Sequence, residues 1–221
     1  RLEKIRTSIA ASCHAAGRRT DEVRLLAVSK TKPAADIRAA LAAGQFDFGE
    51  NYLQEALPKI SEIDQATWHF IGSVQSNKTR DIAANFDWLH SLASEKTARR
   101  LSVQRDPERG PLNTLIQVNI SREPGKSGIE PEALQELVGA ACNLPGIRLR
   151  GLMAIPAAST DAGQQRRQFA ELRILRDAVN DVFELSDFDQ LSMGMTGDFE
   201  SAIKEGATWI RIGSAIFGPR N

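Results

Sequence analysis

Short apolar runs alternate with amphipathic stretches along the whole chain. The apolar runs are four to seven residues long, which is the length of buried strands. They occupy residues 25–29, 46–49, 68–72, 88–92, 114–120, 149–155, 190–194 and 209–213. Each run is followed by a stretch with apolar positions every three or four residues, which predicts a helix or the beginning of one.

Local signals mark some of the helix boundaries. Pro33 stands at the start of the segment 33–44 and Gly44 at its end, as is typical of helix termini. Ser76 or Asn77 can cap the helix that follows the third apolar run, because a short polar side chain accepts hydrogen bonds from the first backbone amides.

The alternation predicts a single α/β domain over residues 1–221. Eight strand–helix units in a chain of 221 residues favour a closed, parallel (β/α)8 barrel of the TIM type. The alternative is an open doubly wound sheet, which usually has fewer strands. Residues 1–13 show helical spacing and predict an extra N-terminal helix. The polar segment 102–113 is interpreted as a surface connection rather than a domain boundary.

Composition and charge narrow the function classes. Lys plus Arg equals Asp plus Glu at 28 each, so no excess of positive charge favours a nucleic-acid or anionic-membrane partner. No apolar run approaches the roughly 18 residues of a membrane span. Cys13 and Cys142 form no C-x-x-C motif, and two free thiols are typical of a reducing cytoplasm. The first residue is Arg1 rather than Met, and we expect a few residues before it.

The residues that follow the strands are candidates for chemistry, because sites in such barrels lie at the carboxyl ends of the strands. Lys30 directly follows the first apolar run, in "RLLAVSKTKP". A lysine at a strand end can simply reach into water, or it can serve as a nucleophile at the mouth of an apolar site. The local pattern leaves both interpretations open.

Two glycine-rich turns near the end of the chain form a candidate phosphate site. "LSMGMTGDFESA" and "IRIGSAIFG" each lead from a strand into a helix, where backbone amides and hydroxyls can bind an anion. Ser192, Gly213 and Ser214 supply those groups. The alternative is that these turns only close the barrel. Asp198 is interpreted as a helix cap.

A lysine and a phosphate site together suit a phosphorylated aldehyde held as a Schiff base. Desolvation lowers the pKa of a lysine amine and makes it a better nucleophile. Pyridoxal 5'-phosphate (PLP) has both an aldehyde and a phosphate, but these residues alone leave Lys30 one lysine among many.

Several stretches resemble the pyridoxal phosphate homeostasis protein family, over nearly the whole chain. They are "LLAVSKTKP", "FGENYLQEALPK", "WHFIGSVQSNK", "LIQVNIS", "RGLMAIP" and "LSMGMTGDFESAIKEGATWIRIGSAIFG". The resemblance implies a barrel like the N-terminal domain of alanine racemase, with PLP bound as a Schiff base on Lys30. It implies that Ser192 binds the phosphate and that Arg211 lies near the pyridine nitrogen. It further implies that Gly213 and Ser214 hold the phosphate through backbone amides.

Three departures from the family pattern are mild. Ser214 stands where threonine is usual, and it keeps the hydroxyl. Ser73-Val74 and Thr196-Gly197 replace other pairs in two motifs. The expected ligands remain in place.

Three further side chains follow or end strands beside the expected ring. Asn51 is a candidate partner of the ring oxygen, and His69 or Met153 is a candidate to pack on the ring face. The alternative for each is a packed or hydrogen-bonded barrel residue. His90 is expected to satisfy a local hydrogen bond.

The resemblance implies a protein of intracellular PLP homeostasis that stores, buffers or delivers PLP and affects amino-acid and keto-acid metabolism indirectly. PLP-dependent apoenzymes are the expected recipients, and a cytoplasmic monomer is the expected form. The alternatives are a racemase-like PLP enzyme and a Schiff-base aldolase that works without PLP.

We expect no catalysis for three reasons. The single tyrosine, Tyr52, is not expected to face Lys30, whereas a racemase of this type needs a tyrosine opposite its lysine. No second domain that could supply one is expected in a chain ending at Asn221. An arginine at the ring nitrogen disfavours its protonation and weakens the cofactor as an electron sink.

Overall fold

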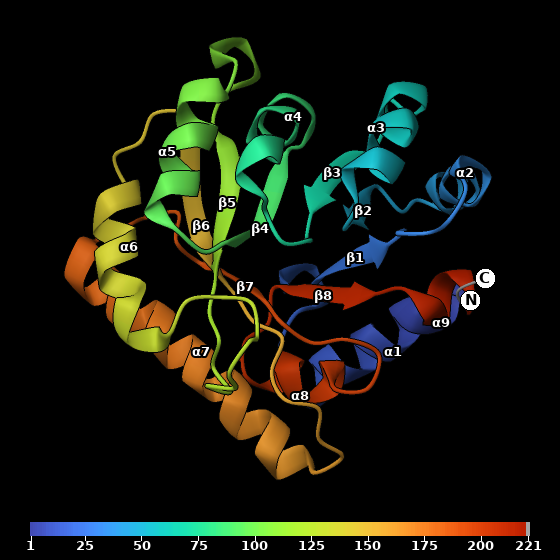
Figure 1. Cartoon of the computed structure of the whole chain (residues 1–221). Coiled ribbons are helices and arrows are strands. Elements are labelled where there is room, and N and C mark those ends of the chain that lie inside the picture. The colour runs from blue at the N-terminus through green and yellow to red at the C-terminus, as the bar shows by residue number, and fades with distance from the viewer. Residues whose placement is uncertain (220–221) are drawn as a thin grey trace.

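The computed structural model describes residues 1–219 and shows a closed barrel of eight parallel strands, with neighbours in sequence order (Figure 1). The strands are β1 (Arg24–Val28), β2 (Asp47–Glu50), β3 (Thr67–Phe70), β4 (Trp88–Leu92), β5 (Leu112–Gln117), β6 (Ile147–Met153), β7 (Gln190–Ser192) and β8 (Trp209–Ile212). The helices are α1 (Leu2–Ala15), α2 (Ala34–Ala42), α3 (Leu53–Glu62), α4 (Thr79–Asn85), α5 (Glu95–Gln104), α6 (Leu134–Ala141), α7 (Ala162–Phe183), α8 (Phe199–Lys204) and α9 (Ser214–Phe217).

The predicted barrel is confirmed, and the open sheet is excluded because β1 pairs with β8. The predicted N-terminal helix is α1, which lies against α8 and α9 on the outside of the barrel (Figure 1). The prediction of one domain over 1–221 stays a prediction, and its last two residues lie outside the described part.

One local prediction is wrong, and another has bounds that are too wide. The surface connection predicted at 102–113 covers only residues 105–111, because α5 runs to Gln104 and β5 begins at Leu112, and it contains a 3₁₀ turn. The buried guanidinium of Arg105 donates to the carbonyls of Ala83 and Phe86 and ties this connection to the end of α4. Residues 76–78 form a 3₁₀ turn before α4, and no side chain caps that helix.

The apolar core has two layers. The larger one fills the space between the strands and the surrounding helices, as the alternation of strand and helix demands. The smaller one fills the inside of the barrel and is built from inward-facing residues of five strands. These are Leu26, Trp88, Leu115, Met153 and Trp209.

Two histidines share the inside of the barrel with that smaller cluster. His69 and His90 are both fully buried, and His69 stacks on Trp88 with ring centroids 5.6 Å apart. His69 Nδ1 lies 3.0 Å from His90 Nε2, and His69 Nε2 lies 3.1 Å from Asp47 Oδ1. Burial lowers the pKa of His69, although Asp47 opposes that shift, and burial lowers the pKa of His90 further. Both rings are therefore neutral at pH 7.

We predict that the protein loses stability as the pH falls below about 6.5. In the unfolded chain these two histidines protonate near that pH, whereas burial keeps them neutral in the folded chain. The unfolded state then binds more protons, which lowers the free energy of unfolding by about 1.4 kcal/mol at pH 5.5 for each histidine that stays neutral. Urea melts at pH 7.5 and 5.5 measure the change. His14→Gln provides the control substitution, because His14 is exposed and lies outside the buried pair. A profile that is flat over this range would contradict the prediction.

We also predict that Gly151→Ala destabilises the barrel by at least about 3 kcal/mol. Gly151 has a φ of +143°, and a Cβ there would lie 1.9 Å from the Gln190 carbonyl oxygen on β7. Gly139→Ala is the matched control, because its Cβ would make only an ordinary contact with the Phe183 ring at 3.6 Å. That helix position should gain about 0.5–1 kcal/mol. Chemical denaturation measures both variants, and equal stabilities would overturn the prediction.

Candidate functional site

A cavity of about 330 Å³ opens at the carboxyl ends of the strands. That volume is within the range of small-molecule pockets. Its wall combines apolar side chains with a few cationic and polar groups. They come from the ends of β1, β2, β3, β6 and β8, from the loops beyond them and from the loop after β7. The lining residues are Val28, Lys30, Lys32, Asn51, Ile71, Met153, Ile155, Met195, Thr196, Arg211, Gly213, Ser214 and Gly218.

Five of the six sequence-predicted site residues line this cavity together. They are Lys30, Asn51, Arg211, Gly213 and Ser214. These residues come from the first, second and last strand–loop junctions, which the closure of the barrel brings side by side. Five of the thirteen lining residues were therefore predicted from the sequence.

Ser192 does not line the cavity. Its side chain is fully buried at the end of β7, where its Oγ lies 2.8 Å from Arg211 Nη1 and 2.9 Å from His90 Nδ1. Thr196, four residues later, reaches the pocket wall instead. The hydroxyl of Ser192 thus contacts the arginine behind the wall.

The two candidate ring-packing residues occupy different depths. Met153 lines the pocket with its side chain almost fully buried, whereas His69 lies beneath the pocket among the rings of Trp88 and Trp209. His90 does satisfy a hydrogen bond, but its partner Ser192 is distant in sequence rather than local.

The backbone around Lys30 is fixed by the turn that ends β1. Thr31 has a φ of +64°, a left-handed conformation that is unfavourable for a β-branched residue. Its amide donates to the Glu55 carboxylate of α3 at 2.8 Å, and the Lys32 amide donates to the Ser29 carbonyl at 3.1 Å. These bonds hold a strained turn that directs Lys30 to the pocket wall.

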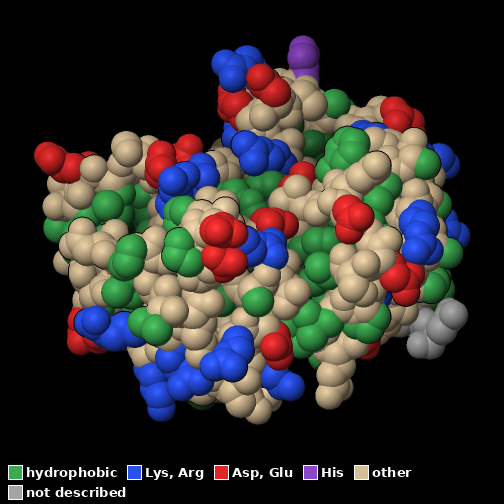
Figure 2. Space-filling view, turned by 90° about the horizontal axis from the view of Figure 1, so that it is seen from above, with side chains coloured by type: hydrophobic (Ala, Val, Ile, Leu, Met, Phe, Trp, Pro, Cys, Tyr) green, Lys and Arg blue, Asp and Glu red, His purple; other side chains and the backbone are tan. Residues whose placement is uncertain are grey.

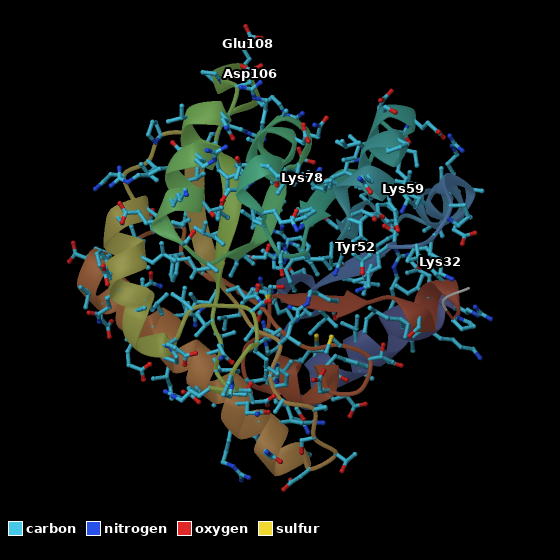
Figure 3. The ribbon with its side chains drawn as sticks, in the orientation of Figure 1. Lys32, Tyr52, Lys59, Lys78, Asp106 and Glu108 are labelled. Atoms are coloured by element: carbon cyan, nitrogen blue, oxygen red, sulfur yellow. The ribbon has the colours of Figure 1, made fainter. Side chains whose placement is uncertain are left out.

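A buried ion pair supports the same turn from behind. Glu50 is fully buried at the end of β2, and its Oε1 accepts from Ser29 Oγ at 2.6 Å and from Lys59 Nζ of α3 at 2.9 Å. Lys59 Nζ also donates to the Ser29 carbonyl at 3.1 Å. Burial raises the pKa of Glu50, while the hydrogen bonds from Ser29 and Lys59 lower it. The network joins β1, β2 and α3 beside Lys30 (Figure 3 shows Lys59 on that side of the molecule).

Arg211 is the most deeply buried charge of the pocket wall. Its side chain donates through Nη1 to Ser192 Oγ and through Nη2 to the Ala154 carbonyl at 2.9 Å. Burial lowers the pKa of Arg211 to about 10, and the carboxylate of Asp198 opposes that shift. The guanidinium therefore remains charged at pH 7.

The two glycine-rich turns meet at one side of the pocket. Gly213 precedes α9, and a Cβ on it would lie 3.2 Å from the Val28 carbonyl oxygen, so the turn packs closely on β1. The first amides of α9 have no partner within a helix and are available to an anion. Asp198 precedes α8 but does not cap it, because its carboxylate accepts from the Met195 amide at 2.6 Å.

Tyr52 lies away from the pocket wall. It directly precedes α3, and half of its side chain is exposed to solvent. Figure 3 shows Tyr52 and Lys32 on the side of the molecule where β1 and α3 lie, far from Asp106 and Glu108 at the tip of the loop before β5. The pocket therefore contains no tyrosine among its lining residues.

Four apolar residues of the pocket wall, and the residues behind that wall, were not predicted from the sequence. Val28, Ile71, Ile155 and Met195 line the pocket, and their position at strand ends or in the following loops was the available signal. Asp47 and Lys59 contact site residues only through other side chains, so no strand-end rule identifies them.

Within residues 1–219, no helix is long and apolar enough to cross a bilayer, and no cluster of His, Cys, Asp and Glu could hold a metal ion. Positive and negative side chains occur together across the face shown in Figure 2.

The chain is similar to several known proteins. A family described as the alanine racemase N-terminal domain matches residues 5–221. A pyridoxal phosphate homeostasis protein of Pseudomonas aeruginosa is 52% identical over 222 residues, which cover 100% of this chain and 94% of the relative. The protein of that name from Escherichia coli is 45% identical, with 100% and 95% covered.

Solved structures of other proteins are also similar to this chain. PipY of Synechococcus elongatus, solved with PLP bound, is 36% identical with a TM-score of 0.83 and covers 95% of this chain and 100% of its own. An alanine racemase from Corynebacterium glutamicum has a TM-score of 0.73 at 16% identity, with 99% of this chain and 62% of that one covered, so it shares the fold. With its barrel, its pocket and these relatives taken together, the chain belongs to the pyridoxal phosphate homeostasis protein family.

Proposed function

We propose that this protein binds PLP in the barrel-mouth pocket and takes part in PLP homeostasis by storing, buffering or delivering it. The observation that carries the proposal is the presence of Lys30, Arg211 and Ser214 on the wall of one cavity of about 330 Å³. An amine, a guanidinium and a hydroxyl beside free helix amides suit an aromatic aldehyde phosphate. The PLP bound to the related PipY and the names of the curated relatives support the same ligand.

The residues of the pocket fit PLP chemically. Asn51 Oδ1 is buried and has no hydrogen-bond partner within the described residues, although its side chain lines the pocket. A buried amide without a partner is costly, and a polar ring substituent would satisfy it. Ile71, Met153 and Ile155 offer apolar surface to the faces of a flat ring.

Lys30 is the proposed covalent tether. In its deprotonated form the amine nitrogen bonds to the aldehyde carbon, and the aldehyde oxygen leaves as water, so that a C=N bond replaces the C=O bond. Lys32 on the same wall adds a positive charge that attracts the anionic phosphate.

The phosphate is assigned to the turns beside α8 and α9. The hydroxyls of Ser214 and Thr196 line the pocket there, next to the amides that follow Gly213. Ser192 was expected as a phosphate ligand, and we propose instead that it orients Arg211 from behind the wall. Arg211 would then face the ring nitrogen with a full positive charge.

We propose a carrier rather than an enzyme. A cation at the ring nitrogen keeps that nitrogen unprotonated, and this weakens PLP as an acceptor of electrons from a substrate. The pocket wall also lacks a tyrosine that could serve as a second base across the ring from Lys30. A cytoplasmic monomer that passes PLP to PLP-dependent apoenzymes is the form we propose.

We predict that Lys30→Arg abolishes the covalent link. The purified wild-type protein incubated with PLP should absorb in the visible range, and borohydride should fix a pyridoxyl group on Lys30 that peptide mass spectrometry locates. Lys30→Arg keeps the positive charge but cannot form the C=N bond, so it should bind PLP at least about tenfold more weakly and give no adduct.

Lys78→Arg is the matched control, because Lys78 lies in the turn before α4 and does not line the pocket. It should retain the wild-type adduct. A wild-type protein that binds no PLP would overturn the proposed function, and an adduct on another lysine would overturn the tether. Racemisation of amino acids by the loaded protein would favour an enzyme instead of a carrier.

A further inference from the structure

A continuous line of hydrogen bonds crosses the inside of the barrel from end to end. Arg211 Nη1 lies 2.8 Å from Ser192 Oγ, which lies 2.9 Å from His90 Nδ1. His90 Nε2 lies 3.0 Å from His69 Nδ1, and His69 Nε2 lies 3.1 Å from Asp47 Oδ1. These four contacts join residues of five strands, with sequence separations of 19, 102, 21 and 22 residues.

Each end of this line opens into a cavity. Arg211 lines the pocket at the carboxyl ends of the strands. Asp47 begins β2 at the opposite end, where it lines a second cavity of about 330 Å³ together with Arg24, and 29% of its side chain is exposed. The three residues between the ends are fully buried.

The chemistry of the end groups fixes the direction of every bond. A carboxylate only accepts, so His69 must donate from Nε2 to Asp47. A neutral His69 then accepts at Nδ1 from His90 Nε2–H, and His90 accepts at Nδ1 from the Ser192 hydroxyl. Ser192 is left to accept from Arg211, whose guanidinium only donates. All five groups are satisfied in one direction, with both imidazoles in the Nε2–H form.

Burial favours the neutral form of both rings, and nearby carboxylates oppose it only at His69. His69 faces the carboxylates of Asp47 on β2 and of Asp87 before β4, and it also faces His90 on β4 and Arg24 on β1. His90 faces His69 on β3 and Arg211 on β8. A proton on His90 would be repelled by the buried guanidinium and has no carboxylate partner within the described residues.

We propose that Ser192, His90, His69 and Asp47 form a one-directional hydrogen-bond relay that positions Arg211, and that Asp47 sets its direction from the far end of the barrel. Reversing the relay would require a proton on Asp47 or His69 and a new acceptor for the Ser192 hydroxyl. Arg211 Nη1 therefore always has an acceptor inside the barrel, and the guanidinium is held at the pocket wall. The consequence for PLP rests on the proposed function, whereas the relay itself does not.

Nitrogen-15 NMR of the histidine rings tests the relay without PLP. The chain has three histidines, and the exposed His14 gives the third signal, from outside the barrel. We expect His69 and His90 to show only the Nε2–H tautomer between pH 6.5 and 8. An Nδ1–H signal or a charged ring at either residue in this range would overturn the proposal.

Asp47→Leu removes the terminal acceptor without touching the pocket. We expect a second tautomer at His69 and, together with it, at His90, in roughly a tenth of the molecules or more. Asp21→Leu is the matched control, because Asp21 is an exposed carboxylate near the same end of the barrel and pairs only with Arg19 in the described part. A His90 spectrum that is unchanged in Asp47→Leu would overturn the relay. If that variant fails to fold, Asp47→Asn replaces it, and a second tautomer is again expected at both histidines.

The same two variants also test whether the relay affects PLP binding. Asp47→Leu should shift the visible absorbance of bound PLP and weaken its binding about threefold to tenfold, the range of one or two hydrogen bonds, while Asp21→Leu should match the wild type. Unchanged absorbance and affinity in Asp47→Leu would overturn the positioning of Arg211. A wild-type protein that binds no PLP while its histidines show the expected tautomers would overturn only the proposed function.

Discussion

The burial of one positive charge at the closed seam of the barrel is the constraint on which the site depends. Arg211 lies on β8, which pairs with both β1 and β7, so its position is available only when the barrel closes. Removing a guanidinium from water is costly unless its donors are satisfied. The Ser192 hydroxyl at the end of β7 and the Ala154 carbonyl after β6 accept two of its hydrogen bonds. The position of this cation therefore depends on the closed barrel and not on the conformation of a loop.

The two buried charged groups near the pocket are stabilised in different ways. Glu50 has a direct cation partner, Lys59, and both are held between the barrel and α3. Within residues 1–219, Arg211 contacts no carboxylate. It donates to the hydroxyl of Ser192, and hydrogen bonds through two imidazoles connect that hydroxyl to Asp47. The first arrangement fixes the backbone before Lys30, and the second fixes the guanidinium across the pocket. A ligand that spans the two would find both of its partners preorganised.

The barrel and the polar part of the pocket wall could be predicted from the sequence, because both follow from short-range rules. Eight apolar runs of strand length define the barrel, and strand ends define the wall, so Lys30 and Arg211 could be placed without coordinates. Ser192 shows where such rules stop. It ends β7, as expected, but its side chain points behind the wall, and the period-two alternation along a strand of three residues is too short to settle which way it points.

Sequence patterns do not predict the proposed relay through the barrel, for a related reason. His69 and His90 were visible as strand residues, but their contacts join residues of β2, β3, β4 and β7 whose register only the closed barrel sets. A polar line in an apolar interior is costly if any member is unsatisfied. Here every donor meets an acceptor, and the order of tautomers is fixed by a carboxylate at one end and a guanidinium at the other. In the proposed relay the barrel interior links its two ends, and the position of the guanidinium that faces the pocket depends in part on a residue at the opposite end.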